Sequence, residues 1–222
     1  MYFILTEIYI CLVSFLSLII YSLKNQNNKT FSYIMLLFTI IIFFLILDSN
    51  FEISLNIYIF NFNLKLNSMI IFIKLVIIAF LFNYIYLAKD YFIFEKVYIK
   101  EFLLVIWLCI VAVFFMIMSN EFFLLYLALE LQNLVLYIIA CLRRQRSLSV
   151  EAGIKYYIMG SFSSGLLLYG IIMLFSFTGT LDFIEISYLI KDVNYININY
   201  LIYFFLFIFF GLLFKLGAAP LH

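Results

Sequence analysis

Charge is scarce in this chain, and so are the residues that bind metals and cofactors. Charged side chains make up 11% of the 222 residues, and there are one histidine, one proline, three cysteines and seven glycines. Cys11, Cys109 and Cys141 lie in separate apolar segments without a CxxC pair, which excludes a zinc or iron–sulfur ligand set. His222 alone cannot provide bis-histidine haem ligation, and there is no glycine-rich phosphate loop. We therefore expect any electron transfer to take place in partner proteins.

Hydrophobic residues dominate instead, at 68% of the chain with a mean hydropathy of +1.20. A membrane-spanning helix needs about 20 mostly apolar residues. The apolar runs are continuous rather than alternating, which favours helices over a membrane barrel. The sequence predicts an all-α, polytopic membrane helical bundle with about seven spans. The first three, at 4–23, 31–47 and 69–88, form an N-terminal region over residues 1–100, and the other four, at 101–118, 121–141, 153–177 and 199–219, form a second region over 101–222.

Basic residues predict the orientation of these spans. Only Lys65 and Lys191 fall in loops on one side, whereas eight of the 13 lysines and arginines fall on the other: Lys24, Lys29, Lys89, Lys96, Lys100, Arg143, Arg144 and Arg146. By the positive-inside rule, the eight-residue side is the cytoplasm or organelle matrix and the N-terminus is outside. The first residues lack the pattern of a cleavable targeting peptide. The abundance of Phe (29) and Tyr (18) suggests an AT-rich organelle gene.

Two loops on the predicted outer side, 48–68 and 178–198, are long enough to form surface structure. The second mixes acidic and aromatic residues, so one interpretation is an amphipathic segment in the membrane interface. We favour the simpler interpretation of a packing loop.

The fifth span places a carboxylate, Glu130, near the middle of a membrane-length apolar segment. An ionised side chain at the bilayer centre costs at least roughly 2.5–3.5 kcal/mol, and it usually faces a partner or a hydrated cavity. On a helix, Tyr126, Glu130, Asn133 and Tyr137 form one polar stripe, which can line such a cavity. The alternative is a protonated Glu130 that acts only as a hydrogen-bonding contact between helices.

The sixth span begins with a charged pair and continues with small residues. Glu151 and Lys155 have the acid-first i,i+4 spacing of a helical ion pair, and transport and an interfacial salt bridge are both open interpretations. Small residues four apart, which let another helix approach closely, follow at Gly160, Ser161, Ser164 and Gly165.

The seventh span carries Lys215 and ends at Pro220. Proline disfavours helical geometry in the preceding residue, so we expect a break near Ala219. Lys215 either takes part in proton transfer or extends its ammonium group to the membrane surface.

Three blocks in this half of the chain carry a resemblance: ELQNLVLYIIA, EAGIKYYIMGSFSSGLLLYGIIMLFSFTGT and GLLFKLGAAPLH. They resemble, in order, the subunit 2 family of the proton-pumping NADH:ubiquinone oxidoreductase, respiratory complex I, which is antiporter-like. The resemblance covers roughly residues 100–222. Residues 1–100 are similar only in hydropathy and helix count.

This resemblance implies a fold of fourteen helices with two inverted five-helix repeats, each with a broken helix, that form linked half-channels. It assigns Glu130 to the family's fifth-helix glutamate and Lys215 to its seventh-helix lysine partner, with His222 as the histidine just beyond. Glu151 and Lys155 match the sixth-helix acid–lysine pair. Glu101, at the start of the fourth span, matches a further family glutamate. These six residues are the expected proton-translocation residues.

The sequence departs from the family by lacking the eighth helix and the second repeat. We therefore expect a split subunit whose C-terminal half is a separate chain, with a truncated gene model as the rival explanation. Further partners implied are other membrane-arm subunits and lipids, not nucleic acid. NADH, FMN, iron–sulfur clusters and ubiquinone are expected in partner subunits of the mitochondrial inner membrane. The alternatives are a cation/proton antiporter subunit and a structural subunit with silent charges.

Overall fold

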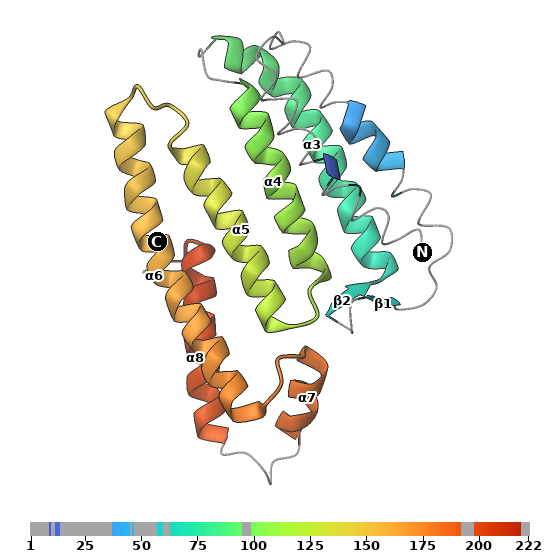
Figure 1. The fold of residues 1–222 in the computed structure, drawn as a ribbon, viewed down its shortest axis with the longest axis vertical. Helices are drawn as coiled ribbons and strands as arrows, with labels where there is room; N and C mark the ends of the chain where they lie inside the picture. The colour runs from blue at the N-terminus through green and yellow to red at the C-terminus, as the bar shows by residue number, and fades with distance from the viewer. Residues whose placement is uncertain are drawn as a thin grey trace.

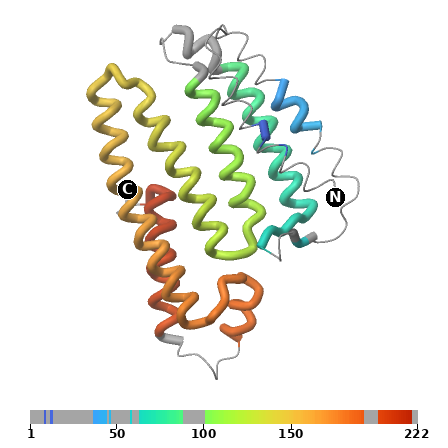
Figure 2. The backbone as a smooth tube through the Cα atoms, in the orientation of Figure 1, coloured from blue at the N-terminus to red at the C-terminus, as the bar shows by residue number. Residues whose placement is uncertain are grey.

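The computed structural model describes residues 9, 12–13, 37–44, 46, 57–59, 63–94, 99–191 and 198–218. Within these ranges the chain is nearly all helical, with long helices side by side and short elements gathered at one end (Figures 1 and 2). The elements are β1 (Ile57–Ile59), β2 (Leu64–Leu66), α3 (Ser68–Phe94), α4 (Ile99–Met118), α5 (Phe122–Ala140), α6 (Ser147–Thr178), α7 (Phe183–Lys191) and α8 (Ile198–Lys215). Residues 37–44 and 46 are also helical.

Four of the described helices are long and apolar enough to cross a membrane. They are Ser68–Leu87 of α3, Glu101–Met118 of α4, Phe122–Ala140 of α5 and Ser147–Thr178 of α6, and Tyr200–Lys215 of α8 is a shorter apolar helix. These confirm the predicted spans from the third to the sixth, and they define a multi-pass membrane protein. Within the predicted spans 4–23 and 31–47, the structure describes residues 9, 12–13, 37–44 and 46, all of them helical.

The predicted boundaries were wrong for α3, α6 and α8, and α8 ends at Lys215 rather than near Ala219. Helix α3 continues to Phe94, so Lys89 lies within the helix rather than after it. Helix α6 begins at Ser147, six residues before the predicted start, and its 32 residues correspond to about 48 Å. That exceeds the roughly 30 Å hydrocarbon layer, so charged residues of its first turns extend beyond it. Hydropathy alone misses such polar helical ends. Gly179 ends the helix with a left-handed φ of 75°, and its N–H donates to the Phe175 carbonyl.

The apolar side chains form two main clusters. In the first, α3 and α4 pack together through Ile71, Ile78, Trp107 and Phe114, all nearly fully buried. In the second, α6 packs against α8 and α7 through Leu167, Ile171, Leu174, Ile186 and Ile208. Helix α5 contacts both α4 and α6 and so joins the two clusters. This arrangement places the middle of α5 beside the contact between α6 and α8 (Figure 1).

The predicted outer loop 48–68 contains a small antiparallel hairpin, which a purely helical prediction did not include. Strands β1 and β2 pair with Tyr58 opposite Lys65. Alternate residues of β2, Leu64 and Leu66, are buried against Met118 at the end of α4. The Asn120 N–H donates to the Asn63 carbonyl, which ties the hairpin to the connection between α4 and α5.

The second outer loop, 178–198, contains a helix, so our preference for a simple packing loop was wrong. Helix α7 occupies residues 183–191 and buries Ile186, while Ile184 and Tyr188 are exposed. The connections at its start are held by reciprocal backbone bonds, since Phe122 donates to Leu181 and Phe183 donates to Asn120. A helical period of apolar residues within the mixed sequence was the signal for this element.

Candidate functional site

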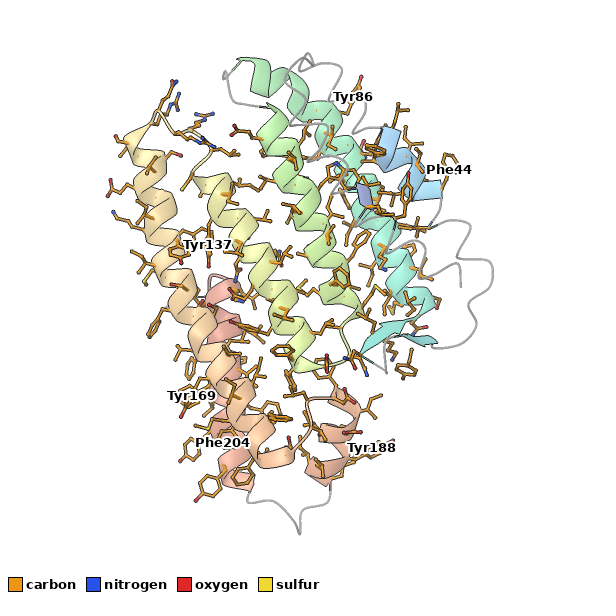
Figure 3. All side chains as sticks on the ribbon, in the orientation of Figure 1. Phe44, Tyr86, Tyr137, Tyr169, Tyr188 and Phe204 are labelled. Atoms are coloured by element: carbon orange, nitrogen blue, oxygen red, sulfur yellow. The ribbon has the colours of Figure 1, made fainter. Side chains whose placement is uncertain are left out.

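The polar stripe predicted on the fifth span lies on the face of α5 that meets α6 and α8. Asn133 and Tyr137 are buried, and Tyr126 packs against the cluster formed by α6 and α8. The ring of Tyr137 makes edge contacts with Tyr156 and Tyr157 of α6, in the space between the two helices (Figure 3). Spacing by three and four residues therefore identified the face of α5 that meets α6 and α8.

Glycines allow α8 to approach α6 closely. A Cβ added to Gly211 of α8 would lie 2.6 Å from Leu167 Cβ, and one added to Gly170 of α6 would lie 2.8 Å from Ile208 Cγ1. Lys215 follows Gly211 by four residues and shares its helix face. The close contact at Gly211 thus directs Lys215 toward the crevice between α6 and α5. Neither glycine was predicted from the sequence, although their small size within apolar helices was the available signal.

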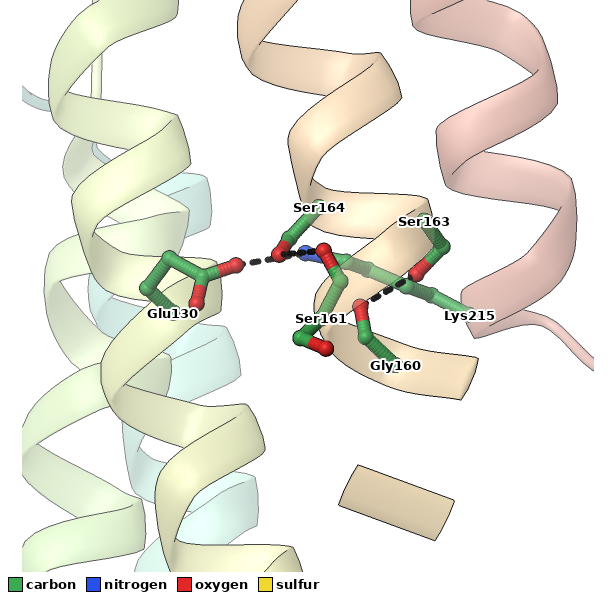
Figure 4. Close-up of polar contacts among 6 residues, drawn as sticks. All are labelled: Glu130, Gly160, Ser161, Ser163, Ser164 and Lys215. Atoms are coloured by element: carbon green, nitrogen blue, oxygen red, sulfur yellow. Dashed lines mark hydrogen bonds and ion pairs between the residues drawn. The ribbon is translucent and has the colours of Figure 1, made fainter. Parts of the chain in front are cut away.

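Lys215 and Glu130 meet in the middle of the bundle (Figure 4). The Lys215 Nζ lies 3.7 Å from Glu130 Oε1, and the exposed fractions of the two side chains are 12% and 27%. This distance exceeds the 2.7–2.9 Å of a charge-assisted hydrogen bond, so the contact is an ion pair without a hydrogen bond. The prediction that Lys215 is the partner of Glu130 agrees with this geometry, whereas extension of Lys215 to the membrane surface does not.

Three buried polar atoms in this region lack a hydrogen-bond partner within the described residues. They are Glu130 Oε1, Lys215 Nζ and Asn133 Nδ2. The nearby serine hydroxyls of α6 do not donate to Glu130, because Ser163 donates to the Gly160 carbonyl and Ser164 donates to the Ser161 carbonyl (Figure 4). Buried polar groups usually have partners, so the unmatched atoms can exchange hydrogen bonds with water or with each other.

Of the small residues predicted to pack on α6, one pair faces α5 and the other does not. Gly160 and Ser164 are buried, and a Cβ on Gly160 would overlap the Tyr137 hydroxyl. Ser161 is exposed, and nothing lies within 4 Å of a Cβ added to Gly165. Within the described residues, the structure therefore shows close packing for Gly160 and Ser164, and the prediction for Ser161 and Gly165 stays a prediction. Sequence spacing cannot tell which of two adjacent small-residue rows meets a neighbour.

The second charged pair, Glu151 and Lys155, forms at the start of α6. Lys155 Nζ lies 2.5 Å from Glu151 Oε1, and both side chains are largely exposed. Ser164, beside the Glu130–Lys215 pair, lies nine residues beyond Lys155, or ~13 Å along the helix. The described structure thus confirms the ion pair itself, while its role in transport stays a prediction.

Glu101 lies in the first turn of α4 and pairs with an arginine of the connection between α5 and α6. Its Oε2 accepts from Arg144 Nη2 at 3.3 Å. This pair is at the end of the bundle that also contains the start of α6, away from the central pair (Figure 1). The remaining predicted residue, His222, lies outside the described residues.

A further buried lysine lies in the predicted span 69–88 and was not among the expected proton-translocation residues. Lys74 of α3 is almost fully buried; its Nζ donates to Met118 Sδ at 2.9 Å and lies 5.3 Å from the centre of the Phe114 ring. The sequence signal was a lone cation in the middle of an apolar segment. Among the residues that the structure describes, no three His, Cys, Asp or Glu side chains gather as a metal site.

The site defines a class: a multi-pass membrane protein with an acid–lysine pair held between packed helices. Residues 119–222 match the family described as NADH:quinone oxidoreductase/Mrp antiporter, transmembrane region. Subunit N of NADH-quinone oxidoreductase from Bartonella bacilliformis is 43% identical over 128 residues, 58% of this chain and 26% of that protein. Subunit N from Pelagibacter ubique is 30% identical over 223 aligned positions, 99% of this chain and 45% of that protein.

A solved structure agrees with this relationship at the level of the fold. A chain of respiratory complex I from Thermus thermophilus, solved with bound aureothin, is similar with a TM-score of 0.76 and 17% identity. The match covers 98% of this chain and 45% of that chain. Residues 119–222 thus match the NADH:quinone oxidoreductase/Mrp antiporter family, and the chain is similar to subunit N along nearly its whole length. It spans less than half the length of the curated relatives named here.

Proposed function

We propose that this chain is a membrane-arm subunit of a proton-pumping NADH:quinone oxidoreductase, in which Glu130 and Lys215 form part of a proton half-channel. The observation that carries the proposal is their 3.7 Å contact in the middle of the bundle. Two opposite charges at this depth are costly to bury and uncommon without a function. The homology to subunit N supports the choice of complex.

The pair works as a charge switch. At about 4 Å and an effective dielectric constant near 20, two unit charges attract by about 4 kcal/mol. Contact with Glu130 therefore stabilises the protonated form of Lys215, and separation of the two side chains lets Lys215 give up its proton. The absence of a hydrogen bond between them makes this separation easier, because no directional bond must break.

The other predicted residues extend this path. Glu151 and Lys155 form a second pair on α6, Glu101 lies at the same end of the bundle, and His222 follows Lys215 in the sequence. Redox energy enters through partner subunits, which are expected to bind NADH, FMN, iron–sulfur clusters and ubiquinone. The mitochondrial inner membrane and a complete fold of fourteen helices are part of the same proposal.

The test measures membrane potential per assembled complex in Glu130→Gln and Lys215→Met variants. Both variants should assemble into the complex and oxidise NADH but lose most proton pumping, since each removes a titrating group from an apolar helix. Glu185→Gln and Lys191→Gln on α7 are matched controls, because they remove an exposed carboxylate and an exposed ammonium. Unchanged pumping per complex in the first two variants would refute the charge switch and favour silent structural charges.

A second candidate is a subunit of a cation/proton antiporter, because the matching family includes the Mrp antiporters. The same ion pair can then exchange protons for another cation without redox partners. Purification of the native assembly separates the two candidates. Copurifying flavin and iron–sulfur subunits support the oxidoreductase, and cation-dependent proton exchange in an assembly without them supports the antiporter.

A further inference from the structure

A groove of about 630 Å³ lies where α4, α5 and α6 diverge. Its walls are mainly apolar and include Leu104 and Leu108 of α4, Ile138 of α5, and Ile154 and Tyr157 of α6. Its volume is within the roughly 300–1,000 Å³ of sites that bind small molecules. Ile138, Ile154 and Tyr157 are each about half exposed, so the groove opens to the surroundings of the bundle. An apolar ligand can therefore enter it from the side.

The length of the groove favours a lipid chain over a protein helix. On α4 it reaches only from Glu101 to Leu108, or ~10 Å along the helix. A partner helix that crosses the membrane needs a contact surface along much of its roughly 30 Å span. A flexible acyl chain, in contrast, can fill a short groove and continue into the bilayer. Each buried CH₂ group favours binding, which makes such a groove attractive for a phospholipid.

The mouth of the groove adjoins a basic connection at the end of the membrane-spanning helices. Arg144 lines it, with a side chain that is 77% exposed and one guanidinium nitrogen on Glu101. Arg143 and Arg146 belong to the same short connection between α5 and α6. The connection 141–146 thus carries three arginines and no acidic residue. Guanidinium groups bind phosphate well, and basic pockets between membrane helices hold anionic lipid headgroups.

We propose that this groove is a binding site for one anionic phospholipid, with an acyl chain between α4 and α6 and the phosphate at Arg144. Helix α5 forms the floor, which runs from Tyr137, nearer the middle of the helix, to Cys141 and Leu142 beside the arginine-rich connection. Gly153 keeps α6 close to this floor, because a Cβ there would overlap Cys141 Sγ. The site is separate from the Glu130–Lys215 pair and does not depend on the proposed proton transfer.

The test uses the purified full-length chain in phosphatidylcholine nanodiscs that contain a minor fraction of phosphatidylglycerol. Native mass spectrometry counts the lipids that remain bound. The wild type should retain one phosphatidylglycerol in preference to phosphatidylcholine. Ile154→Trp should abolish retention by filling the groove. Ile172→Trp is the matched control on α6, because the exposed fractions of Ile154 and Ile172 are 53% and 54% and only Ile154 lines the groove.

Two charge variants test the headgroup contact in opposite directions. Arg144→Gln should lower the preference for phosphatidylglycerol about fivefold, the effect of one basic residue near a membrane surface. Glu101→Gln should raise it, because it frees Arg144 and removes a negative charge. Equal retention of the two lipids by the wild type, or equal loss in Ile154→Trp and Ile172→Trp, would overturn the proposal. So would a wild-type chain that retains no lipid while circular dichroism shows its helices intact.

Discussion

The ammonium of Lys215 and the carboxylate of Glu130 face each other across the crevice between α8 and α5 at 3.7 Å, without a hydrogen bond. Neither helix alone determines this distance. It depends on α6, which packs against both, through Gly160 on the α5 side and Gly170 on the α8 side. Changes in the packing of α6 are therefore expected to alter the charge pair.

The first prediction concerns the energetic coupling of the pair. Glu130→Gln leaves the buried Lys215 charge without its partner, and it should destabilise the protein by about 2 kcal/mol, within the range for interacting residues. The double variant Glu130→Gln with Lys215→Met should regain most of that stability, because no charge remains to be buried. Thermal unfolding of the wild type, the two single variants and the double variant in detergent gives the coupling energy. If the two single-variant effects on stability simply add, Glu130 and Lys215 have no energetic interaction in the folded protein.

The second prediction concerns Gly211, which sets the distance between α6 and α8. Gly211→Ala adds a Cβ 2.6 Å from Leu167 Cβ and 3.1 Å from the Ser163 carbonyl, and it should cost roughly 1–3 kcal/mol by overpacking. Proton pumping per complex should also fall, because Lys215 lies one turn further along. Gly165→Ala is the control: its Cβ meets nothing within 4 Å, and alanine should stabilise the helix by roughly 0.5–1 kcal/mol.

The third prediction concerns the contact between Tyr137 and Gly160. Gly160→Ala should destabilise the α5–α6 packing, because the new methyl group overlaps the tyrosine hydroxyl. Combining it with Tyr137→Phe should restore part of the loss, since the hydroxyl is removed but the ring carbon Cζ, at 2.7 Å, remains. Unfolding temperatures of both single variants and the double variant provide the comparison. A double variant less stable than Gly160→Ala would show that the hydroxyl is not the obstacle.

The fourth prediction concerns pH and the outer end of α5. Glu121 precedes the α5 span, and its backbone forms an isolated antiparallel β-bridge with Asp182. Burial, followed by repulsion from Asp182, raises the pKa of Glu121 above its ordinary value of 4.5. A carboxyl with a raised folded pKa contributes stability below its unfolded value, and this contribution disappears as pH rises through the folded value.

Glu121→Gln should therefore be more stable than the wild type at pH 7, and the difference should vanish below about pH 4.5. Unfolding temperatures measured across this range test the expectation. Glu185→Gln removes an exposed carboxylate of α7 and is the control. The same pH profile in both variants would assign the effect to net charge rather than to Glu121.

The sequence by itself determined the class of protein and the face of α5 that matters. Long apolar runs require spanning helices, because backbone groups in lipid must bond internally. A carboxylate at mid-span requires a partner, and helical spacing placed Glu130 on one face with Asn133 and Tyr137. Both inferences hold because they depend on local periodicity and on the cost of charge in lipid.

Only the tertiary structure decided which residues meet across helices. It set the 3.7 Å distance between Lys215 and Glu130, whose partnership the family resemblance had implied. It also chose Gly160 and Ser164 over Ser161 and Gly165 as the contact row, and it built a hairpin and α7 in the outer loops. The physical reason is that contacts between helices depend on their rotation and on close packing of side chains. Neither follows from the hydropathy of one segment, because lipid and a neighbouring helix are both apolar surroundings.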